Sequence, residues 1–147
     1  MLETIINKYP ELDVRIYGSE SFRESFPNHY KSWIQFNESR KVFHNSRINI
    51  STHVTTNGDM YINERVTQIL GSQGLLLVDH VKGIEKVLEP NQECIIMDMR
   101  SIDLMADQIK NILDNYSEYE YIKEKGYQKA LEKLTWDSWA NTILSNI

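Results

Sequence analysis

The chain has 147 residues, 41% of them hydrophobic and 25% charged, which fits one compact domain with its own core. Its net charge is −5 and no third of the chain is strongly basic, which excludes broad electrostatic binding of nucleic acid or anionic membranes. The single cysteine, Cys94, excludes an internal disulfide framework, and no apolar run approaches the roughly 20 residues of a membrane helix. We expect a cytoplasmic protein without nucleic-acid partners or stable membrane insertion.

Short strands and helices are expected to alternate along the chain. Residues 1–6 are predicted to form a leading helix. Five apolar runs are predicted to be strands, and these are residues 14–17, 33–36, 48–50, 75–78 and 94–97. The last two runs are continuous rather than alternating, a pattern typical of strands buried on both faces of a parallel sheet. Cys94 lies in the last run and is interpreted as a buried structural thiol.

Helical spacing appears between and after these strands. Residues 62–70 place their apolar side chains on one face, and Gly71 ends that segment. Residues 102–113 are predicted to form a helix of about four turns that Ser101 opens. Two more amphipathic helices are expected over residues 117–133 and 136–143. This alternation predicts a single α/β domain with an open, doubly wound sheet, which binds ligands at the carboxyl ends of its strands.

A glycine directly follows the first predicted strand, in Tyr17-Gly18-Ser19. At this position Gly18 would let the backbone turn sharply and approach a ligand closely. A plain strand-to-helix turn explains the same residues. The segment lacks the further glycines of a dinucleotide fingerprint and the Gly-Lys-Ser/Thr of a P-loop, so it argues against dehydrogenases and kinases.

A long polar stretch, residues 51–60, joins the third strand to a helix expected to begin near Tyr61. Backbone amides around Gly58 and Tyr61 would then lie at a helix start and could hold a phosphate, with Arg65 one turn further in supplying charge. Gln68 follows Arg65 by three positions and could reach a sugar hydroxyl. The alternative is an ordinary capped helix, with Arg65 in a surface ion pair and Gln68 in solvent.

Other polar residues offer less. Asp79 and His80 follow the most buried strand and suggest acid–base chemistry, but no nucleophile is placed to complete a triad. The histidines His29, His44 and His53 have no partner at metal-ligand spacing and are interpreted as surface or capping residues. The sequence therefore predicts no metal site and no hydrolase or phosphatase centre.

Five segments follow one another in a recognisable order: Tyr17-Gly18 after a strand, then residues 46–50, 63–74, 75–79 and 83–85. This order resembles the C-terminal domain of GT-B glycosyltransferases of the glycosyl transferases group 1 type. The nearest resemblance within it is to the CgeB-like, spore-maturation-type group. The tail, in which Gly126-Tyr127 is followed by Leu134-Thr135-Trp136, also resembles the family's last helices, where a small-residue turn precedes a Thr-Trp or Thr-Tyr element.

The resemblance implies a fold and a ligand. The fold is a Rossmann-like three-layer α/β/α domain over residues 1–147, with a mainly parallel sheet of about five strands and C-terminal helices, forming one half of a GT-B fold. The ligand is a nucleoside diphosphate sugar. The residues implied to bind it are Gly18, Asn57, Gly58, Asp59, Met60, Tyr61, Arg65 and Gln68.

The resemblance also implies roles within that set. Arg65 would neutralise the departing diphosphate and is the catalytic residue, and residues 57–61 would cradle the phosphates. Gln68 stands where many relatives have a Glu that contacts the ribose, and Met60 stands where many retaining relatives have a second Glu. The nucleobase is expected near residues 35–37.

A GT-B enzyme closes two Rossmann-like domains over its cleft, and only one fits in 147 residues. The acceptor-binding N-terminal half is therefore expected to be absent and to be supplied by a separate domain or partner chain. We expect the isolated chain to bind donor weakly and to transfer little or no sugar. We also expect that the reaction needs no metal or other cofactor, since no Asp-x-Asp motif is present. The alternative is a non-catalytic module of the same fold that binds a nucleotide or docks a partner protein.

Overall fold

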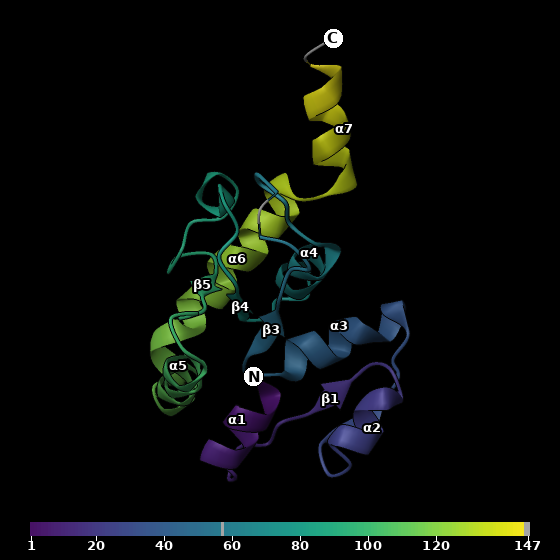
Figure 1. Cartoon of the computed structure of the whole chain (residues 1–147). Helices are drawn as coiled ribbons and strands as arrows, with labels where there is room; N and C mark the ends of the chain where they lie inside the picture. Colours follow the sequence, from purple (N-terminus) through teal and green to yellow (C-terminus); the bar gives the residue numbers. More distant parts are fainter. Residues whose placement is uncertain (57, 146–147) are drawn as a thin grey trace.

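The structure is a computed structural model that describes residues 1–56 and 58–145 (Figure 1). Its strands are short and pair only in parallel. They are β1 (Ile16–Tyr17), β2 (Tyr30–Ser32), β3 (Asn49–Ser51), β4 (Leu76–Val78) and β5 (Ile95–Ile96). β1 pairs with β2, and a second sheet has the order β3-β4-β5. The number of parallel strands in the described residues is the five expected from the sequence, but they form two sheets rather than one.

Helices surround these strands. They are α1 (Leu2–Lys8), α2 (Ser21–Ser25), α3 (Phe36–Asn45), α4 (Glu64–Gly71), α5 (Ile102–Asp114), α6 (Glu120–Lys133) and α7 (Trp136–Leu144), with short 3₁₀ turns at Ile84–Lys86 and Tyr116–Tyr119. The Ser101 side chain accepts a hydrogen bond from the Leu104 amide and caps α5, as predicted. In Figure 1, α7 extends away from the rest of the molecule. No helix in residues 1–56 and 58–145 has the length and apolar character needed to cross a bilayer.

Successive side chains of the central strand β4 enter two different cores. Leu75 and Leu77 pack with α1 and α5 on one face of the sheet. Leu76 and Val78 pack with α4 and α6 on the other. Because neighbouring strand residues point to opposite faces, a strand between two helix layers must be apolar throughout. The three-layer α/β/α arrangement and the buried fourth strand predicted from the sequence are confirmed.

One predicted strand is wrong. Residues 33–36 do not form a strand, because β2 lies earlier, over Tyr30–Ser32, and Phe36 already begins α3. The buried aromatic of this region is Tyr30, which is 8% exposed and donates a hydrogen bond from its hydroxyl to the Gly18 carbonyl. Trp33 and Phe36 are instead 65% and 68% exposed. An apolar run read without its neighbours does not show which of its rings is buried.

Candidate functional site

A pocket of about 570 Å³ opens where the carboxyl end of β3 meets the first turn of α4. This is the edge of the sheet at which α/β proteins bind their ligands. One wall comes from the residues after β3 and the other from the residues that begin α4. The lining residues are Thr52, His53, Val54, Tyr61, Asn63, Glu64, Arg65 and Gln68.

Asn63 joins the two walls. Its side-chain oxygen accepts hydrogen bonds from the Val66 amide and from the Ser51 hydroxyl, both at 3.2 Å. Its side-chain nitrogen donates to the Thr52 carbonyl at 3.0 Å. Asn63 is therefore the N-cap of α4 and also fixes the helix start to the end of β3. The expected helix start near Tyr61 is corrected to Glu64, since the capping residue decides where the helix begins.

The two polar side chains predicted on α4 both reach the pocket. Arg65 is exposed and Gln68 is partly buried. Among the residues that the structure describes, neither the Arg65 guanidinium nor the Gln68 side-chain amide has an ion-pair or hydrogen-bond partner. The surface ion pair considered for Arg65 is thus not formed in that part of the chain. A guanidinium and an amide are both able to bind a phosphate or a hydroxyl.

The loop between β3 and α4 lies against the segment that follows β4. The Met60 amide donates to the Lys82 carbonyl at 2.8 Å, and Lys82 Nζ lies 3.9 Å from the Asp59 carboxylate. Gly83 has a φ of +82°, and a Cβ there would lie 2.8 Å from Asp59 Oδ1 and 2.9 Å from Met60 Cγ. The loop and this glycine therefore touch directly, which a side chain at position 83 would prevent.

The site residues predicted in this loop are only partly brought together. Tyr61 lines the pocket and is 44% exposed, whereas Gly58, Asp59 and Met60 lie outside its lining. Met60 adopts a left-handed conformation with a φ of 55°, and its amide is already bonded. Asn57 lies outside the described residues.

Gly18 does not line the pocket either. It follows β1 in the other sheet and has a φ of +148°, a conformation that favours glycine. Its amide donates to the Ser32 carbonyl at 3.1 Å, so the residue links β1 to β2. In Figure 1, α3 lies between the β1–α2 segment and α4. The predicted contact of Gly18 with a ligand stays a prediction.

One pair of site residues was misread from the sequence. His53, interpreted as a surface or capping histidine, has a fully buried side chain, and its Nδ1 lies 2.6 Å from Asp79 Oδ1. The Asp79 carboxylate also accepts the His53 amide, at 3.0 and 3.2 Å. His80, which was considered together with Asp79 for acid–base chemistry, pairs with Glu85 at the surface. The available signal was position: His53 and Asp79 follow adjacent parallel strands, whose carboxyl ends meet.

Other side chains considered for chemistry have structural roles. The ring nitrogens of His29 and His44 contact the carbonyls of Val14 and Ser72. Within residues 1–56 and 58–145, no group of three or more His, Cys, Asp or Glu side chains gathers closely enough to hold a metal ion. Cys94 is fully buried, as predicted.

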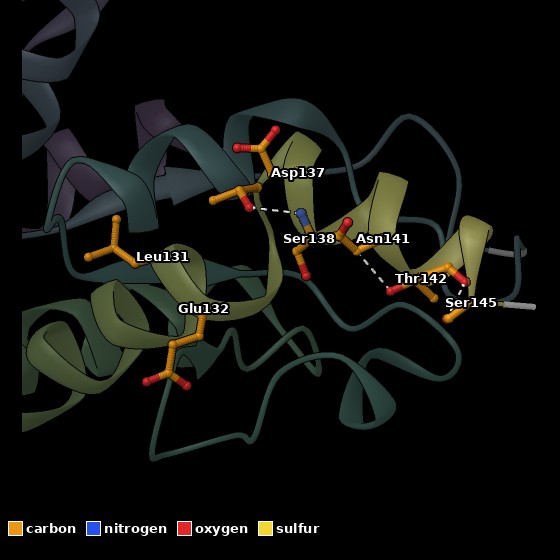
Figure 2. A pocket seen from close by; sticks show the side chains of 8 residues that line it. Leu131, Glu132, Asp137, Ser138, Asn141, Thr142 and Ser145 are labelled. Atoms are coloured by element: carbon orange, nitrogen blue, oxygen red, sulfur yellow. Dashed lines mark hydrogen bonds between the residues drawn. The ribbon is translucent and has the colours of Figure 1, made fainter.

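A second hollow, of about 660 Å³, lies between the end of α6 and α7 (Figure 2). Hydroxyl groups in its lining form hydrogen bonds with the nearby backbone. Thr135 caps α7 by accepting from the Ser138 amide, and Thr142 donates to the Ser138 carbonyl. Its two charged residues, Glu132 and Asp137, are both acidic and point to opposite sides in Figure 2. This hollow offers no positive charge for an anion, so the pocket beside Arg65 is the stronger candidate.

Comparison with known proteins decides the family. A family model described as glycosyl transferase-like matches residues 1–145. The chain belongs to the glycosyl transferase-like family. No curated protein matches this member of the family.

Solved structures agree with this family in fold. The glycosyltransferase from Rickettsia africae ESF-5 superposes with a TM-score of 0.71 at 11% identity, covering 96% of this chain and 41% of that one. Sucrose-phosphate synthase from Thermosynechococcus elongatus gives 0.63 at 11% identity, covering 86% and 32%. Anabaena HepE, solved in complex with UDP-glucose, gives 0.62 at 10% identity, covering 86% and 35%. The fold is one half of a GT-B glycosyltransferase, and the chain spans about a third to two fifths of these structures.

Proposed function

We propose that this transferase-like chain is the donor-binding domain of a glycosyltransferase that moves a sugar, of hexosyltransferase type, from a nucleoside diphosphate sugar to an acceptor. The observation that carries the proposal is the pocket at the end of β3, lined by Arg65 and Gln68. Both side chains are without partners among the described residues, so a ligand would break no internal contact of theirs. The UDP-glucose bound to Anabaena HepE makes a nucleotide sugar the natural first candidate.

Arg65 is proposed to act on the leaving group. When the bond between the sugar and the diphosphate breaks, negative charge builds up on the phosphate oxygens. A guanidinium already in place stabilises that charge more than it stabilises the bound donor, which lowers the barrier. We propose that this fixed charge serves where other transferases use a metal ion, so that no cofactor is needed.

The roles of the other predicted residues stay proposals. Gln68 lies three residues beyond Arg65 on α4 and would bond a hydroxyl of the donor without adding charge. Loop residues 57–61 would border the phosphates, with Tyr61 at the pocket wall. The Met60 amide can join them only after it leaves the Lys82 carbonyl. For the nucleobase, the exposed ring of Phe36 at the start of α3 offers a stacking surface.

A second half is proposed to bind the acceptor, as a further domain or a partner chain. The solved transferases are longer, and this chain corresponds to 41%, 32% and 35% of them. The isolated chain is then expected to bind donor weakly and to transfer little or no sugar. The proposed setting is the cytoplasm, and within the family the CgeB-like group remains the nearest by its sequence segments. Sugar transfer by the isolated chain would contradict the need for a second half.

A second function is favoured by one feature. Met60 and Gln68 replace the two acids expected from the resemblance, and Met60 contacts Gly83 and lies outside the pocket lining. A chain without these acids could be a non-catalytic module of the same fold that binds a nucleotide or docks a partner protein. A docking module differs from the donor domain in nucleotide affinity and in the dependence of that affinity on Arg65.

The test is a calorimetric titration of the chain with UDP, GDP, dTDP and CMP, repeated with Arg65→Ala. Removing charge-assisted hydrogen bonds of about 1.5–3 kcal/mol weakens binding roughly ten- to hundredfold. Arg15→Ala is the matched control, because it removes an exposed guanidinium that pairs with Asp13 and does not line the pocket. Binding that survives Arg65→Ala, or no binding at millimolar nucleotide, would contradict the donor site and favour the docking module.

A further inference from the structure

The His53 imidazole carries the polar atom of the site whose hydrogen bonding is incomplete. Its Nε2 is buried and has no hydrogen-bond partner among the described residues. It is the one buried side-chain nitrogen or oxygen in that part of the chain of which this is true. A buried polar atom left without a partner costs about 1–3 kcal/mol, so such atoms in proteins almost always have a partner in the protein, in water or in a ligand.

The other ring nitrogen fixes what Nε2 can do. Asp79 Oδ1 lies 2.6 Å from Nδ1, and the same carboxylate accepts the His53 backbone amide. A carboxylate can only accept hydrogen bonds, so Nδ1 carries the proton. In the neutral ring Nε2 then holds a lone pair and acts as an acceptor. In that form the partner that it lacks is a donor.

This requirement selects among the parts of a nucleotide sugar. Phosphate oxygens are acceptors at neutral pH and cannot donate to a lone pair. Hydroxyl groups can donate, and a nucleoside diphosphate sugar carries them on the ribose and on the transferred sugar. The charged Arg65 on the facing wall matches the phosphates instead. The pocket thus offers Arg65 for the phosphate oxygens and His53 for the hydroxyl groups.

We propose that His53, held by Asp79, accepts a hydrogen bond at Nε2 from a sugar hydroxyl of the bound nucleotide sugar; this inference rests on the proposed function. The Tyr61 ring lies edge-on to the imidazole, with the ring centroids 5.6 Å apart. Tyr61 is 44% exposed, and a surface side chain of this kind changes rotamer rapidly. Because both rings line the pocket, a change of the Tyr61 rotamer would alter the access of a ligand to the imidazole, and His53 is proposed as a binding residue supported by Asp79.

The variant that isolates Nε2 is His53→Asn. The asparagine side-chain NH₂ takes the place of Nδ1–H and keeps the bond to Asp79, whereas nothing replaces Nε2. Loss of one neutral hydrogen bond weakens binding roughly two- to tenfold. The ligands used are UDP and UDP-glucose. A loss seen already with UDP assigns the bond to the nucleoside part, where the ribose hydroxyls and the uracil N3–H are the donors, and a loss seen only with UDP-glucose assigns it to the transferred sugar.

A second measurement, NMR of the imidazole nitrogens, reports directly on the hydrogen bonding of His53 Nε2. The ¹⁵N resonances of the wild-type imidazole show which nitrogen is protonated, and the Nε2 signal moves towards the protonated range when its lone pair accepts a hydrogen bond. We expect the Nδ1–H form in the free protein and this shift on saturation with ligand. A free protein with the proton on Nε2 would overturn the inference, and this readout decides even if His53→Asn does not fold.

The outcomes separate this inference from the proposed function. If UDP and UDP-glucose bind in an Arg65-dependent manner while the Nε2 resonance and the affinity of His53→Asn are unchanged, the donor site stands and the role of His53 is refuted. If UDP, UDP-glucose, GDP, dTDP and CMP all fail to bind the wild-type chain, the proposed function fails and this inference fails with it.

Discussion

Gly126 permits the close approach of α6 to the rest of the domain. It lies inside α6 and is buried where this helix packs against α4. A Cβ added there would lie 2.5 Å from the Glu93 carbonyl oxygen and 2.8 Å from Leu70 Cδ2. Real Cβ atoms essentially never approach other atoms closer than 3.0 Å, so an alanine must push α6 away. We predict that Gly126→Ala destabilises the fold.

The size of the effect follows from two opposing contributions. Alanine raises helix propensity by about 1 kcal/mol over glycine in a helix interior. Overpacking costs about 1–3 kcal/mol, and the upper end applies because the nearer obstacle is a backbone carbonyl rather than a flexible side chain. The net loss is then about 2 kcal/mol. In a chain of this length it corresponds to a fall in Tm of about 4–8 °C.

Gly71 supplies a matched control on α4. It is also a helical glycine, but nothing lies within 4 Å of the Cβ that an alanine would add. Gly71→Ala should leave stability unchanged or raise it by up to about 1 kcal/mol. Urea and thermal unfolding followed by circular dichroism compare both variants with the wild type. A Gly126→Ala protein as stable as Gly71→Ala would refute the packing argument.

Two further predictions concern titratable groups. Burial raises the pKa of the Cys94 thiol to about 12. A thiol reagent at about pH 8 should therefore leave the native protein unlabelled and label one thiol per chain after unfolding. Labelling at equal rates in both states would contradict this prediction. The hydrogen bond from Arg100 lowers the pKa of Asp98 to about 2 from the model-peptide value of 3.8. This depressed pKa stabilises the fold above about pH 4, and the stabilisation is lost as the pH falls towards about 2. The free energy of unfolding of Asp98→Asn, measured with urea, should therefore depend less on pH in this range than that of the wild type. Identical pH profiles of the two proteins would contradict the prediction.

Features set by neighbours in the sequence were predictable. The continuous apolar run of β4 predicted burial on both faces, because such a run has no polar side to place in water. Ser101 predicted the start of α5, since its hydroxyl reaches an amide only three residues away. Gly71 marked the end of α4 for an equally local reason.

Features that depend on contacts between residues far apart in the sequence could not be predicted from it. The resemblance related Gly126 to a small-residue turn, but it lies within α6, and a glycine is needed there because the Glu93 carbonyl and Leu70 occupy the space of a side chain. The start of α4 moved from near Tyr61 to Glu64, because Asn63 binds the end of β3 as well as its own helix. Neither partner can be identified from the spacing of nearby residues.

The candidate site shows the same division. Arg65 and Gln68 were found from their spacing on one helix, and both line the pocket. The pairing of His53 with Asp79 joins residues 26 positions apart through adjacent strands, so it requires the sheet order as well as the sequence. The sequence placed His80 beside Asp79 as a candidate for acid–base chemistry, but His80 pairs with Glu85.

The contacts around the pocket also decide how a ligand would be bound. The Asn63 bonds tie β3 to α4, and the Asp79 bonds to His53 tie β3 to the residue after β4. Because these bonds are made within the protein, they hold the backbone of both walls in place, and a ligand need restrict only side chains such as Arg65 and Tyr61. Such preorganisation lowers the entropic cost of binding. Weak donor binding by the isolated chain would then reflect contacts missing on the open side of the pocket, which a second domain could supply.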